Sequence, residues 1–390
     1  MSPSLAAALV RAEREKLAGV QRIRLGVPFL DFFAGSGLVT EALRGYFTCV
    51  WANDICPKKR AVYVANHGSD HFHLKSITDV SGVELPPAIL SWASFPCQDL
   101  SLAGKLGGIS SSRSGLVWEW LRILDEMPCP PPLLVAENVS GLVSAAKGAN
   151  YLTLHRALTD KGYHVGAVLL DAAHWLPQSR PRTFVIAVSK AVDVASFRAD
   201  GPQWCHPQGL ARALFGLDAT WWVLPRPKAP APALESLIDL DAPYHTDERG
   251  RKTLELIPPH HRERLSRETA LGRQVFPGYK RTRDGNQVLE LRFDGVSGCL
   301  RTARGGSSRE FLVVSTPDGY RTRLLTVREA ARLMGAPDMY KLPGSYNDAY
   351  SAMGDAVAVP VVRHLAAHLL SPLAAQVLEG QCDCSTSSTT

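Results

Sequence analysis

The chain has 390 residues, of which 45% are hydrophobic and 21% charged, an ordinary globular composition with room for two domains at roughly 100–200 residues each. No run of about 18 uncharged apolar residues occurs, and charges soon interrupt the apolar start of the chain, which argues against a transmembrane helix and a secretory signal. The net charge of +6 permits a polyanionic partner without requiring one, and the eight scattered cysteines fit a reducing compartment better than a disulfide scaffold.

Short apolar runs alternate with helical stretches in the first half of the chain. We expect strands at 27–33, 48–53, 89–95, 133–138, 164–170 and 183–188. We expect helices at 37–45, 57–66, 116–126 and 150–161. Strands rich in Val, Leu and Ile that alternate with helices predict an α/β, doubly wound, Rossmann-like domain with a parallel sheet covered on both faces. Ligands of such a domain bind at the carboxyl ends of its strands.

The pattern changes after residue 190. A Pro-rich stretch at 225–232 indicates an extended linker, and the basic segment 260–295 contains the turn pair Asp284-Gly285 between expected strands. Helical periodicity returns at 325–335 and 359–370. We therefore expect a helix at 1–24, a first domain at 25–190, a linker and a smaller second domain at 191–320, a return to the first domain at 321–375 and a disordered tail at 376–390. Cys382 and Cys384 fall in that tail, and we expect no metal site.

A glycine-containing turn follows the first expected strand. In Asp31-Phe-Phe-Ala-Gly-Ser-Gly37, the glycines let a ligand approach a helix N-terminus closely. Asp54, at the end of the second strand, is placed to accept hydrogen bonds from ribose hydroxyls, and Ile55 can pack on an adenine ring. Thr40 replaces the third glycine of the dinucleotide pattern, which favours a nucleoside site. Ordinary turn glycines are an equal alternative at this point.

Three further motifs also follow expected strands. Cys97 lies in Phe-Pro-Cys-Gln at the start of a glycine-punctuated loop, where a reactive thiolate can be placed; the alternative is an inert thiol. Glu137, in Glu-Asn-Val, would be costly to bury without a partner, and the alternative is a capping or salt-bridged Glu. Arg180 and Arg182, in Gln178-Ser-Arg-Pro-Arg, point to one side of an extended segment, unless they form a solvated basic edge.

In order and spacing, these motifs resemble those of the DNA (cytosine-5) methyltransferases of bacterial restriction-modification systems. Two C-terminal blocks, Leu325-Thr-Val-Arg-Glu-Ala-Ala-Arg-Leu and Gly354-Asp-Ala-Val-x-x-Pro, are similar to the same family. The similarity covers residues 27–190 and 295–370, and the insertion between them matches the place of the family's target-recognition domain. The resemblance implies methyl transfer from S-adenosyl-L-methionine to C5 of a specific cytosine in double-stranded DNA.

The resemblance also implies roles for individual residues. Cys97 attacks C6 of a flipped-out cytosine, and Glu137, with a raised pKa, acts as an acid at N3. Arg182, with Arg180 behind it, holds O2 and nearby phosphates. The implied cofactor contacts are Phe33, Ala34, Gly35, Ser36, Gly37, Asp54, Ile55, Ser76, Ile77, Pro96, Leu116, Asp355 and Val357. The implied DNA contacts are Gln98, Arg113, Lys280, Arg281 and Arg283.

Two cofactor positions depart from the family pattern. Ser76 stands where the family often has Asp, and Asp355 stands where it usually has Asn. These departures leave open how this chain holds the adenine ring and the methionine end of the cofactor. Neither of them touches Cys97 or Glu137.

Other hypotheses about function account for less of the chain. An RNA (tRNA) cytosine-C5 methyltransferase shares the Cys and Glu chemistry but is expected to have a smaller, less basic insertion. A nicotinamide dehydrogenase gives Cys97 no role, a non-enzymatic relative is expected to lose the nucleophile, and an amino-group methyltransferase needs a Pro-Pro-aromatic loop. We expect a cytoplasmic, nucleoid-associated monomer with no membrane contact and no stable complex with any cognate restriction endonuclease.

Overall fold

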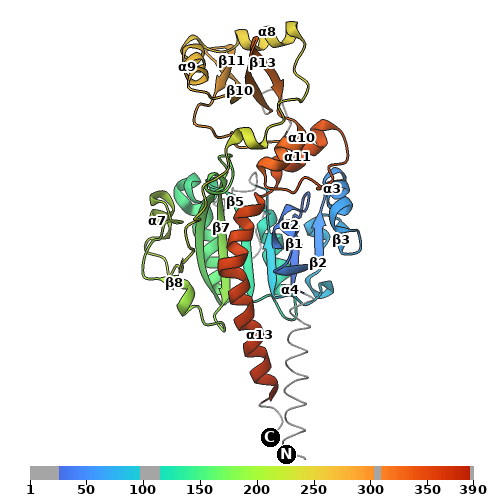
Figure 1. Cartoon of the computed structure of the whole chain (residues 1–390). Helices are drawn as coiled ribbons and strands as arrows, with labels where there is room; N and C mark the ends of the chain where they lie inside the picture. Colours follow the sequence, from blue (N-terminus) through green and yellow to red (C-terminus); the bar gives the residue numbers. More distant parts are fainter. Residues whose placement is uncertain (1–25, 97–114, 303–308, 387–390) are drawn as a thin grey trace, which may run out of the picture.

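The computed structural model describes residues 26–96, 115–302 and 309–386, which form a large body and a smaller one (Figure 1). The large body contains a seven-stranded sheet in the order β3-β2-β1-β4-β5-β7-β6. Its strands are β1 (Val27–Phe32), β2 (Phe47–Asp54), β3 (Phe72–Leu74), β4 (Leu90–Ala93), β5 (Leu133–Val139), β6 (Tyr163–Asp171) and β7 (Pro181–Ser189). All six expected strands are present, with each end within two residues of the expected position. The short β3 was missed.

The sheet is parallel from β3 to β5, but β7 runs antiparallel to both of its neighbours. The expectation of a parallel sheet is therefore wrong at this edge. The connection between β6 and β7 explains the difference, because a parallel crossover needs about a dozen residues or more and residues 172–180 are too few. The short link returns the chain antiparallel beside β6, and residues 178–182 pass the carboxyl end of β5.

Helices cover both faces of this sheet, as expected for a doubly wound fold. They are α2 (Leu38–Leu43), α3 (Pro57–His67), α4 (Leu116–Glu126), α5 (Gly141–Ser144) and α6 (Ala149–Asp160). Alternate residues of β1 show the division: Phe29 packs with α2 in one core, and Leu30 packs with α4 and α6 in the other. Short helical turns complete the connections: η1 (Ile77–Asp79), η2 (Gly82–Glu84), η4 (Ala145–Gly148), η5 (Ala172–His174), η6 (Ala195–Phe197) and η7 (Leu234–Leu237).

The segment after β7 first packs on the large body. It contains β8 (Arg198–Ala199), α7 (Gln208–Leu214) and β9 (Trp221–Trp222). Trp222 is fully buried in the α2-side core, and its indole N–H donates to the carbonyl of Ile186 in β7 at 3.2 Å. Between Trp222 and Leu234 the structure has neither helix nor strand.

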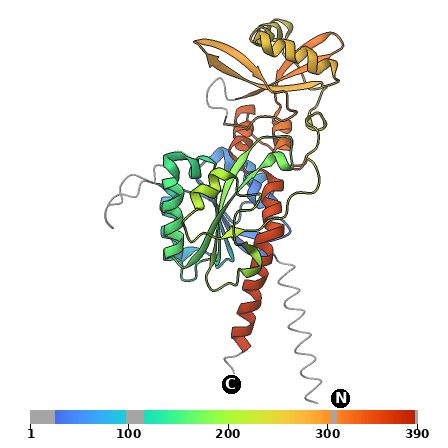
Figure 2. The same cartoon turned by 90° about the vertical axis from the view of Figure 1, so that its left-hand side faces the viewer.

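The smaller body contains a second sheet in the order β11-β10-β12-β13, antiparallel throughout. Its elements are α8 (Asp247–Glu255), α9 (Pro259–Ala270), β10 (Val275–Arg283), β11 (Asn286–Leu291), β12 (Glu310–Thr316) and β13 (Gly319–Leu324). Figure 2 shows the β10–β11 hairpin projecting to one side, with α9 on the far side of the sheet from the large body. Asp284 and Gly285 have φ of 48° and 78°, so the expected two-residue hairpin turn is confirmed.

The last part of the chain returns to the large body, as expected. It forms α10 (Val327–Leu333), α11 (Tyr346–Asp355), α12 (Val359–Leu365), the π-helical η8 (Ala366–Leu370) and α13 (Ser371–Thr386). The expectation of disorder from residue 376 is wrong as far as Thr386, because Leu373 and Ala374 anchor α13 in the core and the helix continues beyond them. Residues 1–24, the expected first helix, lie outside the described residues.

One stretch among the described helices, Tyr346–Gly380, is long and apolar enough to span a membrane by length and composition. Of its most apolar window, 56% is buried inside the protein. Leu365 and Leu369 belong to the same core as α2. This core packing accounts for the apolar character of the stretch.

A buried ion pair joins the two bodies. Arg323 of β13 donates two hydrogen bonds to Glu329 of α10, at 2.6 and 2.7 Å, and their side chains are only 2% and 0% exposed. The guanidinium also donates to the carbonyl of Asp239, and Glu329 accepts from the backbone N–H of the same residue. The junction therefore depends on both charges being present.

We expect Arg323→Met to lower the free energy of unfolding by about 3–5 kcal/mol, because it leaves the carboxylate of Glu329 buried without a counter-charge. Urea unfolding followed by circular dichroism measures the loss. The exposed pair Arg251–Glu255 on α8 is the matched control, and Arg251→Met should cost less than about 1 kcal/mol. Equal losses in the two variants would contradict the importance of burial.

Candidate active site

The turn after β1 meets the end of β2 through backbone-to-carboxylate hydrogen bonds. The N–H of Gly35 donates to Asp54 Oδ2 at 3.0 Å, and the N–H of Cys56 donates to Asp54 Oδ1 at 2.7 Å. Gly37 has a φ of 85°, and a Cβ there would lie 2.6 Å from the His67 ring, so only glycine fits. The structure thus brings the expected residues Gly35, Gly37 and Asp54 together at the carboxyl edge of the sheet.

The other expected residues of this region differ in exposure. Ile55 is 70% exposed at the end of β2, so its side chain can cover a planar ring. Ser76, one of the implied cofactor contacts, caps η1, and its Oγ accepts from the N–H and the hydroxyl of Thr78. Ile77 is buried beside it. Phe33 has a φ of 58°, Ala34 is buried within the turn, and Leu116 begins α4.

Asp31, at the end of β1, is fully buried below this turn. Its Oδ2 accepts from the Thr40 hydroxyl at 3.0 Å, and its Oδ1 has no hydrogen-bond partner among the described residues. Burial raises the pKa of Asp31 to about 8. The carboxyl is therefore neutral at pH 7 and supports the turn without adding charge to it.

The C-terminal block closes over the same turn. The Ser36 hydroxyl donates to the carbonyl of Ala352 at 3.1 Å, and Lys59 Nζ pairs with Asp355 Oδ2 at 2.6 Å. The Lys59 side chain also passes 3.9 Å from where a Gly35 Cβ would lie. Val357 is buried just beyond. Sequence reasoning missed Lys59; its place in the first turn of the helix after Asp54 was the available signal.

The catalytic carboxylate expected at the end of β5 is buried. Glu137 is 6% exposed, and its Oε1 lies 3.2 Å from Arg182 Nε. Burial raises the pKa of Glu137, against the opposing positive charges of Arg182 and Arg180. The next residue, Asn138, donates to the carbonyl of Phe95 at 2.9 Å, and so holds the segment that leads into Cys97.

Several expected residues cannot be placed in this arrangement. Cys97, Gln98 and Arg113 lie outside the described residues. Pro96, the last described residue before them, is exposed.

Arg180 is 1% exposed, and its guanidinium is hydrogen-bonded to backbone carbonyls. Its guanidinium donates to Leu300 at 3.1 Å, to Gly354 at 2.9 Å and to Ala356 at 2.5 Å. Burial lowers its pKa to about 10, so it stays charged at neutral pH. These bonds attach Arg180 to the block that carries Asp355, whereas the resemblance implied a phosphate contact for this residue.

Cys299 links these arginines to the smaller body, a contact that the sequence did not indicate. Its Sγ lies 3.5 Å from Arg180 Nη1 and 4.0 Å from Arg182 Nη1, so both guanidinium groups point to the same side of their segment. The carbonyl of Cys299 accepts from the Tyr279 hydroxyl at 3.1 Å. The second sheet thus begins directly beside the pair of Glu137 and Arg182.

The three cations expected to contact DNA lie along β10 but differ in surroundings. Lys280 Nζ sits 4.9 Å from the centre of the Phe311 ring, and burial lowers its pKa, with the charge of Arg249 adding to the effect. Arg281 lies over the Tyr279 ring. Arg283 makes two bonds to the carboxylate of Glu290. The three side chains are therefore not equally able to bind DNA phosphates.

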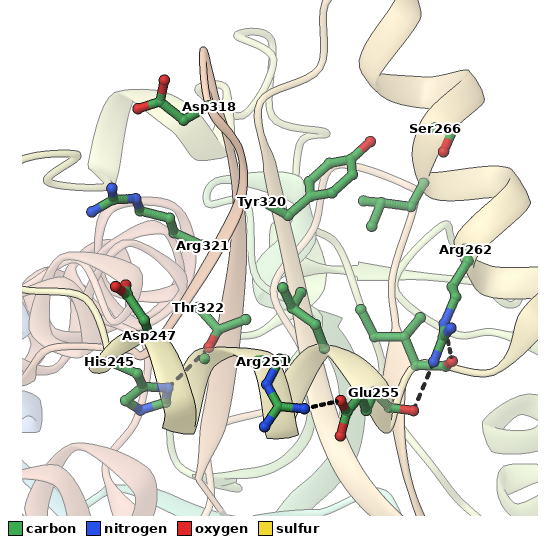
Figure 3. Close-up of a pocket in the computed structure, with 14 residues that line it drawn as sticks. His245, Asp247, Arg251, Glu255, Arg262, Ser266, Asp318, Tyr320, Arg321 and Thr322 are labelled. Carbon is green, nitrogen blue, oxygen red and sulfur yellow. Dashed lines mark hydrogen bonds and ion pairs between the residues drawn. The ribbon is translucent and has the colours of Figure 1, made fainter.

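A cavity of about 590 Å³ lies in the smaller body between α8, α9 and β13 (Figure 3). Tyr320 and Thr322 of β13 line it, whereas Tyr279 projects from the opposite face of the sheet. The cavity is therefore separate from Glu137 and Arg182. Within the described part of the chain, no group of three His, Cys, Asp or Glu side chains is arranged to hold a metal ion.

Comparison with known proteins decides the family. The sequence matches the family described as C-5 cytosine-specific DNA methylase over residues 27–371. The chain belongs to this family. It is 26% identical over 354 residues to the type II methyltransferase M.HhaI of Haemophilus parahaemolyticus, which covers 89% of this chain and 95% of that protein. It is 25% identical over 360 residues to M.HpaII of Haemophilus parainfluenzae, covering 88% and 89%.

Solved structures share the methyltransferase fold. The Dnmt2 methyltransferase of S. pombe aligns with a TM-score of 0.59 at 18% identity, covering 89% of this chain and 99% of that one. Its Spodoptera frugiperda counterpart aligns with a TM-score of 0.57 at 18% identity, covering 87% and 98%. The family match makes this chain a DNA cytosine-C5 methyltransferase.

Proposed function

We propose that the chain methylates C5 of one specific cytosine in double-stranded DNA through a covalent bond between Cys97 and C6 of a flipped-out base. The observation that carries the proposal is the buried pair of Glu137 and Arg182, 3.2 Å apart, next to the segment that leads into Cys97. A carboxyl with a raised pKa beside a fixed guanidinium suits the Watson–Crick edge of cytosine. A base reaches such a pocket only by leaving the duplex stack.

The proposed reaction begins with the thiolate of Cys97 and conserves atoms and charge. The Cys97 thiolate forms a bond to C6, and the ring electrons move toward C5 and N3. Glu137 gives a proton to N3, while Arg182 holds O2. C5 thereby becomes nucleophilic enough to accept a methyl group. Transfer of the C5 proton to a base then restores the C5–C6 double bond and expels the thiolate, and N3 returns its proton to Glu137.

S-adenosyl-L-methionine supplies an electrophilic methyl group when it is bound, and the residues present fit it. Asp54 stands at the place for ribose hydroxyls and Ile55 offers an apolar face, both at the glycine turn. The amino-acid end of the cofactor carries one carboxylate and one ammonium group. Lys59 and Asp355 provide the two complementary charges beside Gly35.

If Lys59 holds that carboxylate, Lys59→Met should weaken binding of S-adenosylhomocysteine by about 10–100-fold, the size of a lost charge-assisted hydrogen bond. Binding of methylthioadenosine, which lacks the amino-acid group, should not change. Isothermal titration calorimetry measures both affinities. Lys58→Met is the matched control, because the exposed Lys58 pairs with Asp348 instead. Equal weakening of the two ligands would remove Lys59 from this role.

The remaining assignments follow the type II relatives. We assign the chain a place in the cytoplasm as a monomer that protects host DNA from a cognate restriction endonuclease without forming a stable complex with it. An RNA (tRNA) substrate is the alternative. The separate second sheet beside Cys299 supports DNA, because it offers a surface for a sequence longer than one base.

Bisulfite sequencing of DNA from cells that express the chain tests the proposal. We expect 5-methylcytosine at one position of one consistent sequence. Purified enzyme should also methylate a duplex that contains this sequence in preference to tRNA. An absence of 5-methylcytosine from DNA, with methylation of tRNA, would replace the DNA assignment by the RNA one.

A further inference from the structure

The register of the second sheet divides its side chains between two faces. Phe276, Leu289 and Phe311 face α8 and α9 and form the core of the smaller body. Because strand residues alternate between faces, Tyr279 and Arg281 lie on the other face. The β12 half of that face packs against the large body through Leu312. The β10–β11 half instead extends with the projecting hairpin (Figure 2).

This second face begins at the active site. The Tyr279 hydroxyl donates to the carbonyl of Cys299, whose sulfur touches Arg182, and Arg182 pairs with Glu137. Arg281 is the next residue outward on the same face, with its guanidinium carbon 5.1 Å from the centre of the Tyr279 ring. A continuous line of contacts therefore runs from the catalytic carboxylate to Arg281.

Arg281 differs from the two cations beside it. Lys280 points to the opposite, helix-covered face, over Phe311. Arg283 shares the face of Arg281 but is held by both oxygens of Glu290. Arg281 has no ion pair to a carboxylate within the part of the chain that the structure describes. Its guanidinium lies over an aromatic ring and donates no hydrogen bond to any other described residue.

We propose that Arg281 is a specificity-determining residue that reads a guanine of the recognition sequence near the target cytosine. The proposal rests on the function proposed above and adds one base contact to it. A guanidinium presents two parallel donors, which match the O6 and N7 acceptors of guanine in the major groove. Stacking on Tyr279 reduces the freedom that Arg281 must lose on binding.

The test compares the sequence preference of variants rather than their rate alone. A duplex library randomised around the site found for the unaltered enzyme is methylated and read by bisulfite sequencing. Arg281→Ala should lose roughly 10–100-fold of the preference for guanine at one position, and Arg281→Lys should recover only part of it. Arg283→Ala is the matched control, and it should weaken all sequences alike without changing the preferred bases.

A second measurement uses the unaltered enzyme, so it does not depend on the folding of a variant. Each guanine of the site is replaced in turn by 7-deazaguanine, which lacks N7. We expect at least one replacement to lower kcat/KM by roughly 10-fold, at the position where Arg281→Ala loses its preference. A site with no guanine other than the one paired with the target cytosine, or an Arg281→Ala variant with full preference at every position, would overturn the proposal while leaving DNA methylation intact. An enzyme that leaves all duplexes unmethylated would overturn both.

Discussion

Cys97→Ala should abolish methyl transfer and leave sequence-specific DNA binding close to that of the unaltered enzyme. Without the thiolate no bond forms to C6, and C5 of cytosine is too weak a nucleophile to take a methyl group. The DNA-binding residues proposed on the second sheet are not changed by this substitution. Transfer of a radiolabelled methyl group to duplex DNA and a gel-shift titration measure the two properties separately.

Trapping the covalent bond tests the attack of Cys97 on C6 independently. A 5-fluorocytosine at the target position carries fluorine in place of the C5 proton. Once S-adenosyl-L-methionine has methylated C5, the thiolate cannot be expelled, so the unaltered enzyme should remain attached to the duplex on a denaturing gel. Cys97→Ala should give no such band. Cys129→Ala is the matched control, because Cys129 is an exposed free thiol, and it should be trapped normally. Methyl transfer by Cys97→Ala would show the covalent mechanism to be wrong.

Glu137→Gln should lower kcat by about 10²–10⁴-fold with little change in KM for DNA, because the amide cannot give a proton to N3. The pH dependence gives the sharper test. Burial raises the pKa of Glu137, so the acid form persists above its usual range, and activity should fall as pH rises through that pKa. The variant should lose this falling limb of the kcat profile.

The control for Glu137 is Glu126→Gln. Glu126 lies at the end of α4, and its carboxylate is paired with Arg122 and the N–H of Gly82. This variant should keep both the rate and the pH profile. If Glu137→Gln retained the falling limb, another group would set it, and the role of Glu137 would be limited to holding Arg182.

Arg180 and Arg182 have different partners, a distinction that the sequence motif does not indicate. The guanidinium of Arg182 lies beside Glu137, whereas that of Arg180 donates to the carbonyls of Leu300, Gly354 and Ala356. Arg180 therefore connects the catalytic strand to the turn that carries Asp355.

The local features of the active site could be predicted from the chain alone. The positive φ of Gly37, the strand that ends at Asp54 and the apolar run that ends at Glu137 each depend on a few neighbouring residues and on periodicity. Their convergence followed from a general property of parallel sheets, whose carboxyl ends share one edge. The hairpin turn at Asp284 and Gly285 was readable for the same local reason.

Only the tertiary structure decided which distant groups became partners. Lys59 and Asp355 meet because α11 returns across the glycine turn, and Arg281 differs from Arg283 because Glu290 on the neighbouring strand occupies only the latter. No local sequence pattern predicts such pairs, because they depend on how distant segments pack. Burial then requires each charge to have a partner from another segment. Composition, periodicity and turn chemistry act over a few residues, whereas packing assigns each buried charge its partner.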